Sequence, residues 1–169
     1  MLRSGVWSKG TYKVFPNLIG LLREINQKLM TDYHQALLPD KIYHLYSRAV
    51  GDEKLFLNEG NYQFFLQNLK KHTDSVCQIY CYSLLPNHFH FLVRIRDESN
   101  LIQHFDFVKK KTYSSLDDDL ADFVMERFSN FLNSYTKSFN KVNDRKGALF
   151  MDYLKRSSLE KDENFSNYI

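Results

Sequence analysis

Two histidines separated by a single phenylalanine are the residues of this chain best suited to chemistry. His88 and His90 lie in a segment that alternates polar and apolar residues, with Phe89 between them. Side chains alternate across a β-strand, so this spacing predicts both imidazoles on one face of a sheet and Phe89 on the other. Two imidazoles on one face can bind one divalent metal ion, although a complete site needs a third ligand from elsewhere. The alternative is a pair of ordinary half-buried histidines.

The string around this pair is longer and more specific than the pair itself. Residues 80–94 are Tyr-Cys-Tyr-Ser-Leu-Leu-Pro-Asn-His-Phe-His-Phe-Leu-Val-Arg. They resemble the REP-associated tyrosine transposases, which are single-tyrosine members of the HUH nuclease superfamily. Supporting similarity lies in Tyr43–Val50, Gly147–Phe150 and Asn167–Ile169. The resemblance covers the chain from Met30 onward.

The resemblance implies a DNA transposase that nicks and rejoins hairpin-forming single-stranded DNA. In such enzymes a tyrosine hydroxyl attacks a phosphodiester and forms a 5′-phosphotyrosine link, which releases a 3′-OH. Tyr168 matches the family's nucleophile, and Mg²⁺ or Mn²⁺ bound by His88 and His90 would polarise the scissile phosphate. Tyr135 is the competing tyrosine, but its place on an apolar helical stripe favours a role in the core.

The chain departs from the family's pattern close to Tyr168. In this branch the third metal ligand is a polar residue, often asparagine, one helical turn after the tyrosine, whereas Ile169 is the last residue here. We therefore expect a C-terminally truncated fragment or a decayed copy, in which residues 30–169 form an incomplete transposase domain. Residues 1–29 are expected to be an N-terminal extension. It is either translated from upstream of the natural start or a genuine extension with an amphipathic helix over Leu18–Leu29.

Basic residues that follow the histidine pair are the candidate DNA contacts. Arg94 and Arg96 share the face parity of the two histidines, so they are predicted to hold phosphates near the metal ion, unless they form a solvated strand end. Lys110 and Lys111, in the cluster that Lys109 begins, are further candidates. Cations at the C-terminal end of a helix also interact favourably with its dipole, which is the alternative explanation of this cluster.

Two other functions stay open on the sequence alone. The first is a non-catalytic nucleic-acid-binding domain on the same fold, as a decayed transposase would be. The second is a metal-dependent phosphodiesterase that uses the same histidine pair without a covalent step. A covalent protein–DNA adduct would identify the transposase chemistry, because the phosphodiesterase yields product without an adduct and the binding domain yields neither.

Hydrophobic periodicity and turn signals predict the elements that must hold these residues. Strands are predicted over Ile42–Val50, Val76–Leu85, His88–Arg96 and Ala148–Arg156. Helices are predicted over Asn58–His72, Leu101–Leu116 and Phe123–Val142, with a further helix starting near Asp162. The short link at Pro86 makes the second and third strands a hairpin. This order predicts an α+β fold with helices packed on an antiparallel sheet, ferredoxin-like as in the HUH nucleases that the chain resembles.

Composition sets the limits of these interpretations. The chain has 169 residues, 43% of them hydrophobic and 25% charged, which fits one compact domain with a substantial core. Its formal net charge of +3 permits DNA binding without requiring it. Cys77 and Cys81 are too few for a disulfide framework, and their spacing favours buried apolar roles over metal or redox chemistry.

The composition also bears on partners and location. No apolar run approaches the ~18 residues of a membrane-spanning helix. We therefore expect no interaction with a membrane. Two cysteines are too few for a disulfide framework, so a reducing cytoplasm is the expected location. Its expected partner is single-stranded DNA with hairpins, with a homodimer as an option.

Overall fold

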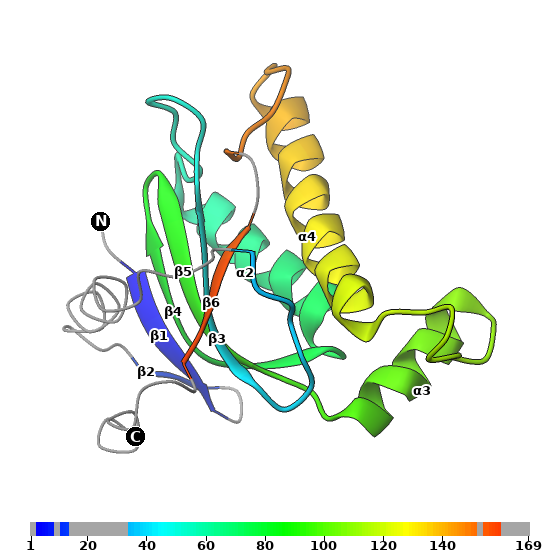
Figure 1. Cartoon of the computed structure of the whole chain (residues 1–169). Helices are drawn as coiled ribbons and strands as arrows, with labels where there is room; N and C mark the ends of the chain where they lie inside the picture. The colour runs from blue at the N-terminus through cyan, green and yellow to red at the C-terminus, as the bar shows by residue number, and fades with distance from the viewer. Residues whose placement is uncertain (1–2, 9–10, 14–33, 152–153, 160–169) are drawn as a thin grey trace.

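The computed structural model describes residues 3–8, 11–13, 34–151 and 154–159, with side chains from residue 34 onward. Within these residues the chain forms one six-stranded sheet and three helices (Figure 1). No helix in these ranges combines the length and the apolar character that crossing a bilayer requires.

The sheet has the strand order β2-β1-β4-β5-β3-β6, and each pair of neighbouring strands is antiparallel. The strands are β1 (Arg3–Ser8), β2 (Thr11–Lys13), β3 (Ile42–Arg48), β4 (Cys77–Leu85), β5 (His88–Ile95) and β6 (Lys155–Ser158). Strands β4 and β5 form the predicted hairpin, and β5 lies between β4 and β3 at the centre of the sheet.

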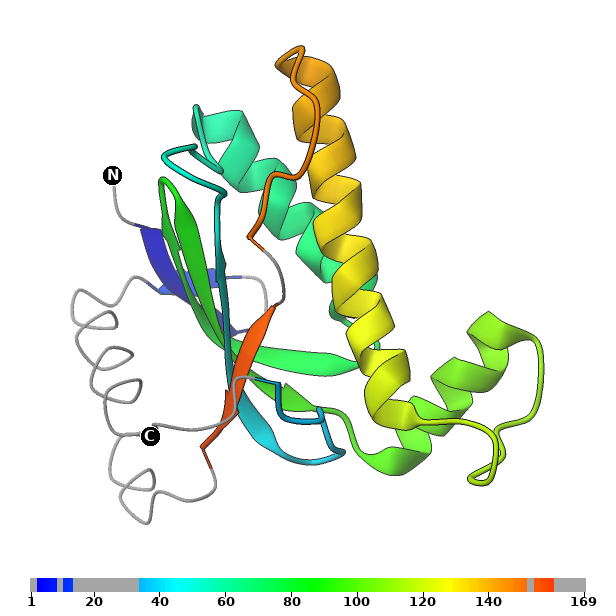
Figure 2. The ribbon, with the colours of Figure 1, turned by 45° about the horizontal axis from the view of Figure 1, so that its top comes forward.

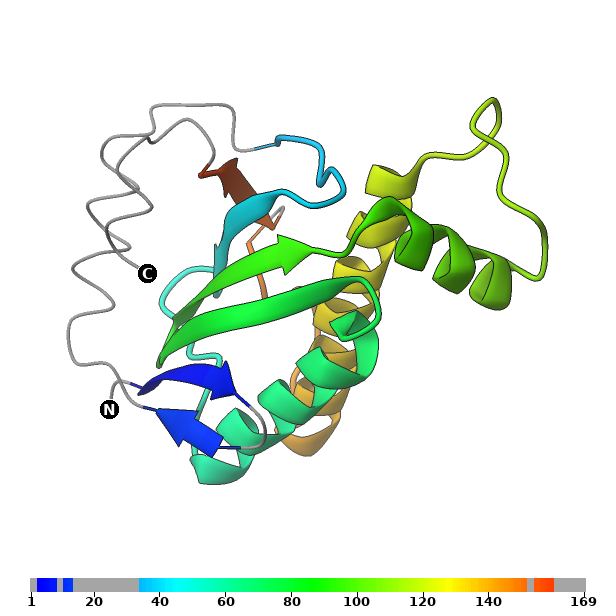
Figure 3. The ribbon, with the colours of Figure 1, turned by 90° about the horizontal axis from the view of Figure 1, so that it is seen from below.

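Three helices accompany the sheet, α2 (Glu59–Thr73), α3 (Glu98–Lys109) and α4 (Leu120–Val142). Figures 1 and 2 show α2 and α4 side by side over one face of the sheet, and the view from below in Figure 3 places both on the same side. Helix α3 follows the end of β5 and extends away from the sheet (Figure 1). The units β3-α2-β4 and β5-α4-β6 are each split by an intervening strand, as in a ferredoxin-like fold. The predicted α+β class with helices on an antiparallel sheet is confirmed.

Aromatic side chains join the two helices to the central strand. The ring of Phe65 on α2 lies 4.9 Å from Phe131 and 4.8 Å from Tyr135 on α4, centroid to centroid. It lies 5.3 Å from Phe89 on β5, whose ring stacks 4.6 Å from that of Phe91. All of these rings are buried. Because Phe89 and Phe91 face the helices, the even-numbered residues of β5 must face the other side of the sheet.

Side-chain caps determine where the helices begin. Asn58, Asp97 and Asp119 each accept a hydrogen bond from a backbone N–H two or three residues later, at the start of α2, α3 and α4. Such a bond satisfies one of the amides that the first turn leaves unpaired. The predicted start of α2 was therefore correct within one residue. Helices α3 and α4 begin three residues before their predicted starts, because the acidic caps lie upstream of the apolar stripes.

The end of α3 differs from the prediction. The helix was expected to continue to Leu116, but it ends at Lys109. Lys110 adopts a left-handed conformation with φ of 56°, and its N–H donates to the carbonyl of Asp106 over 3.0 Å. This is a C-terminal cap built by a lysine where glycine is usual, which is why the sequence pattern did not reveal it.

Both ends of the sheet also differ from the prediction. The last strand was expected over Ala148–Arg156, but β6 covers Lys155–Ser158, and Phe150 forms an isolated bridge with Ala49. The predicted N-terminal extension contributes β1 and β2, where no strand was predicted, and β1 pairs with β4. The helices expected over Leu18–Leu29 and from Asp162 lie outside the described residues.

Candidate active site

The two histidines of the sequence motif lie on the face of the sheet opposite α2 and α4. Strand register brings Tyr46 of β3 and Ser83 of β4 directly beside His90, and Ser157 of β6 directly beside His44. We call this surface the histidine face. Its residues around the pair are His44, Tyr46, Arg48, Ser83, Leu85, His88, His90, Leu92, Lys155 and Ser157.

His88 and His90 lie close together on this face. Their ring centroids are 5.3 Å apart, with the ring planes at 84°. The fully buried Phe89 points between the helices on the other side. The predicted alternation of β5 is therefore observed, while the role of the two histidines as metal ligands remains a prediction.

A third histidine, which the sequence analysis did not single out, lies against this pair. Nε2 of His44 is 2.9 Å from Nδ1 of His90, a hydrogen-bonding distance. The rings of His44, Tyr46 and His90 stack on one another, with centroids between 5.0 and 5.5 Å apart. The signal was present in the sequence, because His44 and Tyr46 alternate with buried residues on a predicted strand. A single histidine in an apolar strand did not stand out.

Burial controls the charge of His44. The side chain is fully buried, and the burial, followed by the neighbouring charge of His90, lowers the pKa of His44 to about 3. At neutral pH His44 is therefore an uncharged imidazole with one N–H donor and one nitrogen acceptor. Its Nδ1 atom is buried without a hydrogen-bond partner among the described residues.

Hydrogen bonding prepares His88 to act as a ligand through its outer nitrogen. Nδ1 of His88 is 2.7 Å from Oδ1 of Asn87 in the β4–β5 turn. The amide oxygen, assigned from this network, can only accept, so Nδ1 carries the proton and Nε2 carries the lone pair. Metal-binding histidines usually have this arrangement, with the second ring nitrogen donating to a neighbouring oxygen.

These residues fit a divalent ion at two coordination positions. The donors are neutral imidazole nitrogens on one face of a rigid strand, which suits ions such as Mn²⁺ better than Mg²⁺, since Mg²⁺ prefers oxygen ligands. Among the residues that the structure describes, no cluster of three or more His, Cys, Asp or Glu side chains could hold a metal ion. A ligand set that includes His88 and His90 therefore needs other donors, such as water or a phosphate oxygen of a substrate.

Of the two tyrosines considered as nucleophiles, the structure describes Tyr135 and not Tyr168. Tyr135 is 1% exposed, and its hydroxyl donates to the carbonyl oxygen of Leu55 over 2.6 Å. Burial, together with the nearby Tyr62, raises the pKa of Tyr135 well above its usual value. This side chain is part of the core, as predicted, and its oxygen is neither accessible nor easily ionised. Tyr168 lies outside the described residues, so its role as nucleophile remains a prediction.

The predicted arginine contacts are not gathered at the histidine pair. Arg94 lies on the same face of β5 as His90. It is four residues farther along the strand, which corresponds to roughly 13 Å. It forms an ion pair with Asp40 at 3.0 Å. Arg96 lies beyond the end of β5 and donates to the backbone carbonyl of Asp74 over 3.0 Å.

The two predicted lysine contacts lie farther away along the fold. Lys110 is the C-terminal cap of α3, and its ammonium group is 4.5 Å from the centre of the Phe107 ring. Lys111 forms an ion pair with Asp118 at 2.6 Å. Helix α3 follows the C-terminal end of β5, whereas the histidine pair is at the N-terminal end of that strand (Figure 1). Lys155 lies on the histidine face, with its ammonium group 5.7 Å from the centre of the Tyr46 ring, and Arg48 is the direct cross-strand neighbour of His88.

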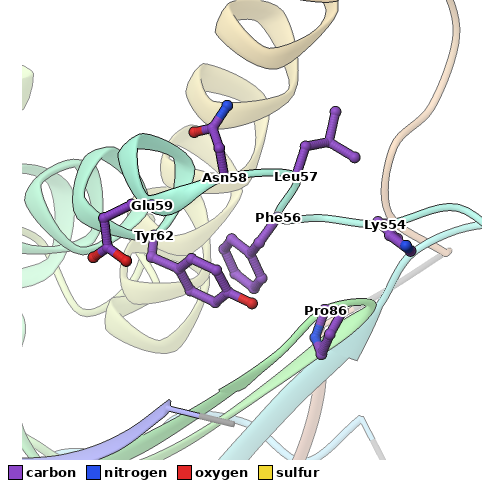
Figure 4. A pocket seen from close by; sticks show the side chains of 7 residues that line it. All are labelled: Lys54, Phe56, Leu57, Asn58, Glu59, Tyr62 and Pro86. Atoms are coloured by element: carbon purple, nitrogen blue, oxygen red, sulfur yellow. The ribbon is translucent and has the colours of Figure 1, made fainter. Parts of the chain in front are cut away.

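A pocket of about 320 Å³ lies between the start of α2 and the β4–β5 turn (Figure 4). The rings of Phe56 and Tyr62 stack 4.3 Å apart at its wall, and Pro86 contributes from the turn. Lys54 and Glu59 also line it, so their opposite charges offset each other and leave little attraction for a phosphate.

Comparisons with known proteins bear on the fold. No protein-family model and no curated protein matches the sequence. Among solved structures, the chain is similar to a REP-associated tyrosine transposase bound to a REP hairpin. The TM-score is 0.54 with 12% sequence identity, over 83% of this chain and 68% of the other. At this identity the similarity establishes a shared fold, and the α+β arrangement predicted from the sequence is the one that the two structures share.

Proposed function

We propose that this chain is a metal-dependent tyrosine transposase that nicks and rejoins hairpin-forming single-stranded DNA through a 5′-phosphotyrosine intermediate. The observation that carries the proposal is the histidine pair. His88 and His90 lie on one face of the central strand, 5.3 Å apart, and Nδ1 of each is within hydrogen-bonding distance of a neighbouring group. This arrangement makes Nε2 of His88 the atom suited to bind a metal ion, and Nε2 of His90 is equally suited when Nδ1 of His90 donates to His44.

In the proposed reaction the chain supplies the nucleophile and holds the substrate. The oxygen of Tyr168 attacks the phosphorus, its proton leaves to water, and the bond to the 3′ oxygen breaks. The 3′ oxygen takes up a proton, and the 5′ phosphate stays on the tyrosine. A divalent ion bound at His88 and His90 would supply Lewis-acid polarisation of the scissile phosphate. The attack reverses when a 3′-OH returns, so rejoining needs no ATP.

Other groups on the histidine face suit a single DNA strand. Lys155 offers a cation to a phosphate, and Tyr46 offers an aromatic ring beside the histidines. Single-strand binders commonly combine these two features, because a ring stacks on any base and a cation tracks the backbone. The hairpin preference is supported by the solved structure of the same fold, which was bound to a REP hairpin.

A non-catalytic DNA-binding domain is the second candidate. It is favoured because no group of three or more His, Cys, Asp or Glu side chains within the described residues could hold a metal ion. Such a domain would bind the same DNA without cleaving it.

A covalent-adduct assay separates the candidates. The chain is incubated with a 5′-tailed hairpin oligonucleotide labelled on the 3′ side, with Mn²⁺ or with a chelator, and resolved on a denaturing gel. The transposase predicts a Mn²⁺-dependent adduct that Tyr168→Phe abolishes and Tyr135→Phe retains. Binding without an adduct or cleavage supports the binding domain, and cleavage without an adduct supports a phosphodiesterase. An adduct that survives Tyr168→Phe would refute our choice of nucleophile.

A further inference from the structure

His44 is the least expected side chain on the histidine face. It is fully buried, and burying a polar imidazole with one nitrogen unpaired costs free energy that an apolar ring would avoid. Its stacking on Tyr46 and His90 does not require nitrogen, because a phenylalanine could stack in the same place. What a phenylalanine cannot supply is the nitrogen atom 2.9 Å from Nδ1 of His90.

This contact decides which nitrogen of His90 is available to a metal ion. One proton lies between Nε2 of His44 and Nδ1 of His90, and it belongs to one ring or the other. If His90 donates, its Nε2 carries a lone pair and can bind a cation. If His44 donates, the neutral His90 carries its own proton on Nε2, which then cannot bind a cation.

The assignment in which His90 donates would give both histidines of the pair the same tautomer. Nδ1 of His88 faces an amide oxygen that can only accept, so His88 presents Nε2, and His90 would then do the same. The assignment also places a proton on Nδ1 of His44, whose direct cross-strand neighbour is Ser157. Neither Nδ1 of His44 nor the buried hydroxyl of Ser157 has a hydrogen-bond partner among the described residues, and a rotation of the hydroxyl toward the ring would let each satisfy the other. Side chains at directly opposed positions are close enough to interact.

We propose that His44 is a positioning residue that accepts the Nδ1–H of His90, and that this hydrogen bond fixes the tautomer and ring plane in which Nε2 of His90 binds the metal ion. The metal-binding half of this inference rests on the proposed function. The tautomer half concerns the protein alone and holds or fails without any metal.

The tautomer is measured in the metal-free chain labelled with ¹⁵N-histidine. Protonated and unprotonated ring nitrogens have well-separated ¹⁵N shifts, and two-bond correlations to the ring protons assign each nitrogen. We expect His90 in the Nδ1–H form in the wild type. In His44→Phe, which keeps a stacked ring but removes the acceptor of the Nδ1–H, we expect the Nε2–H form, which a neutral imidazole intrinsically prefers. A wild-type His90 in the Nε2–H form, or a tautomer unchanged in His44→Phe, would overturn the inference.

Metal affinity is measured by calorimetric titration with Mn²⁺ alone. Loss of an outer hydrogen-bond partner typically weakens metal binding about 10–100-fold, and we expect this loss in His44→Phe. His44→Gln carries an amide oxygen near the place of Nε2 and should recover most of the affinity. His104→Phe is the matched control, because His104 lies on α3 and contacts Ser75 rather than the histidine face. Circular dichroism confirms that each variant is folded.

The outcomes separate the two proposals. Wild-type protein that binds no Mn²⁺ but shows the expected tautomer change would refute the metal-dependent function and uphold the role of His44. Wild-type protein that binds Mn²⁺ with an affinity unchanged in His44→Phe would refute the role of His44 and leave the proposed function intact. Equal losses in His44→Phe and His44→Gln would indicate packing rather than the acceptor nitrogen, and would also overturn the inference.

Discussion

Burial decides which individual side chains of this chain are available for chemistry. Tyr135 and both cysteines are buried, whereas His88 and His90 keep partly exposed rings on the histidine face. A hydroxyl or thiol in the core is a poor nucleophile, because desolvation disfavours its charged form. Burial therefore excludes Tyr135 and both cysteines as nucleophiles, which the sequence alone could not do.

The hydroxyl of Tyr135 is predicted to stabilise the fold without taking part in catalysis. Tyr135→Phe removes the donor to the carbonyl of Leu55 and leaves that buried acceptor unpaired. We expect a loss of about 1–3 kcal/mol in the free energy of unfolding, measured in urea. An unchanged free energy of unfolding, together with loss of the covalent adduct, would mean that this oxygen is catalytic after all.

The cysteine thiols are predicted to be unreactive in the native chain. Burial raises the pKa of Cys77 to about 12 and that of Cys81 to about 11, so almost no thiolate forms at pH 8. A thiol reagent such as Ellman's reagent should react slowly with native protein and should find both thiols in denaturant. Rapid reaction of one thiol before unfolding would show that its strand opens to solvent.

At the scale of elements, the sequence predicted the features that depend on neighbouring residues better than those that depend on contacts between distant segments. Helix α2 was predicted almost to the residue, because its cap Asn58 and its apolar stripe are adjacent in the chain. The alternation of β5, which places His88 and His90 together, is equally local. Strand β1 was missed because its pairing with β4 joins segments far apart in the sequence. The contact of His44 with His90 was missed for the same reason.

The start of α3 provides a test of a single cap. Asp97 accepts hydrogen bonds from Ser99 and Asn100, and these bonds lower the pKa of Asp97 to about 2. A carboxylate whose pKa is lower in the folded state stabilises that state above its unfolded pKa of about 4, and the contribution is lost as the pH falls through about 2. Asp97→Asn keeps a capping side chain without the charge. The thermal midpoints of the two proteins should therefore converge on acidification, and a constant difference would contradict this account.

At the scale of the whole molecule, the distribution of cations over the fold bears on DNA binding. The formal net charge is only +3, so the affinity must depend on where cations lie more than on their number. Lys155 lies on the histidine face, and Lys110 and Lys111 lie at the end of α3.

We predict a preference for hairpin-bearing single strands over blunt duplex of equal length, with a clear dependence on salt. Each phosphate contact to a single strand contributes about 0.7 to the slope of log K against log salt concentration. Lys155→Ala should reduce the slope by about this amount, and Lys110→Ala should change it less. Fluorescence anisotropy over a salt series measures both slopes. Duplex that competes as well as the hairpin, or a larger effect of Lys110→Ala, would contradict the proposed binding face.

The outer strands of the sheet have a consequence for the behaviour of the protein in solution. Among the described strands, β2 at one edge has three residues and β6 at the other has four. An exposed edge offers unpaired backbone groups to a second molecule, and the length of the edge limits how many bonds can form. Edge strands this short are poor templates for joining sheets of neighbouring molecules. We therefore expect β2 and β6 to contribute little to aggregation of concentrated protein, even though the four inner strands together are rich in apolar residues.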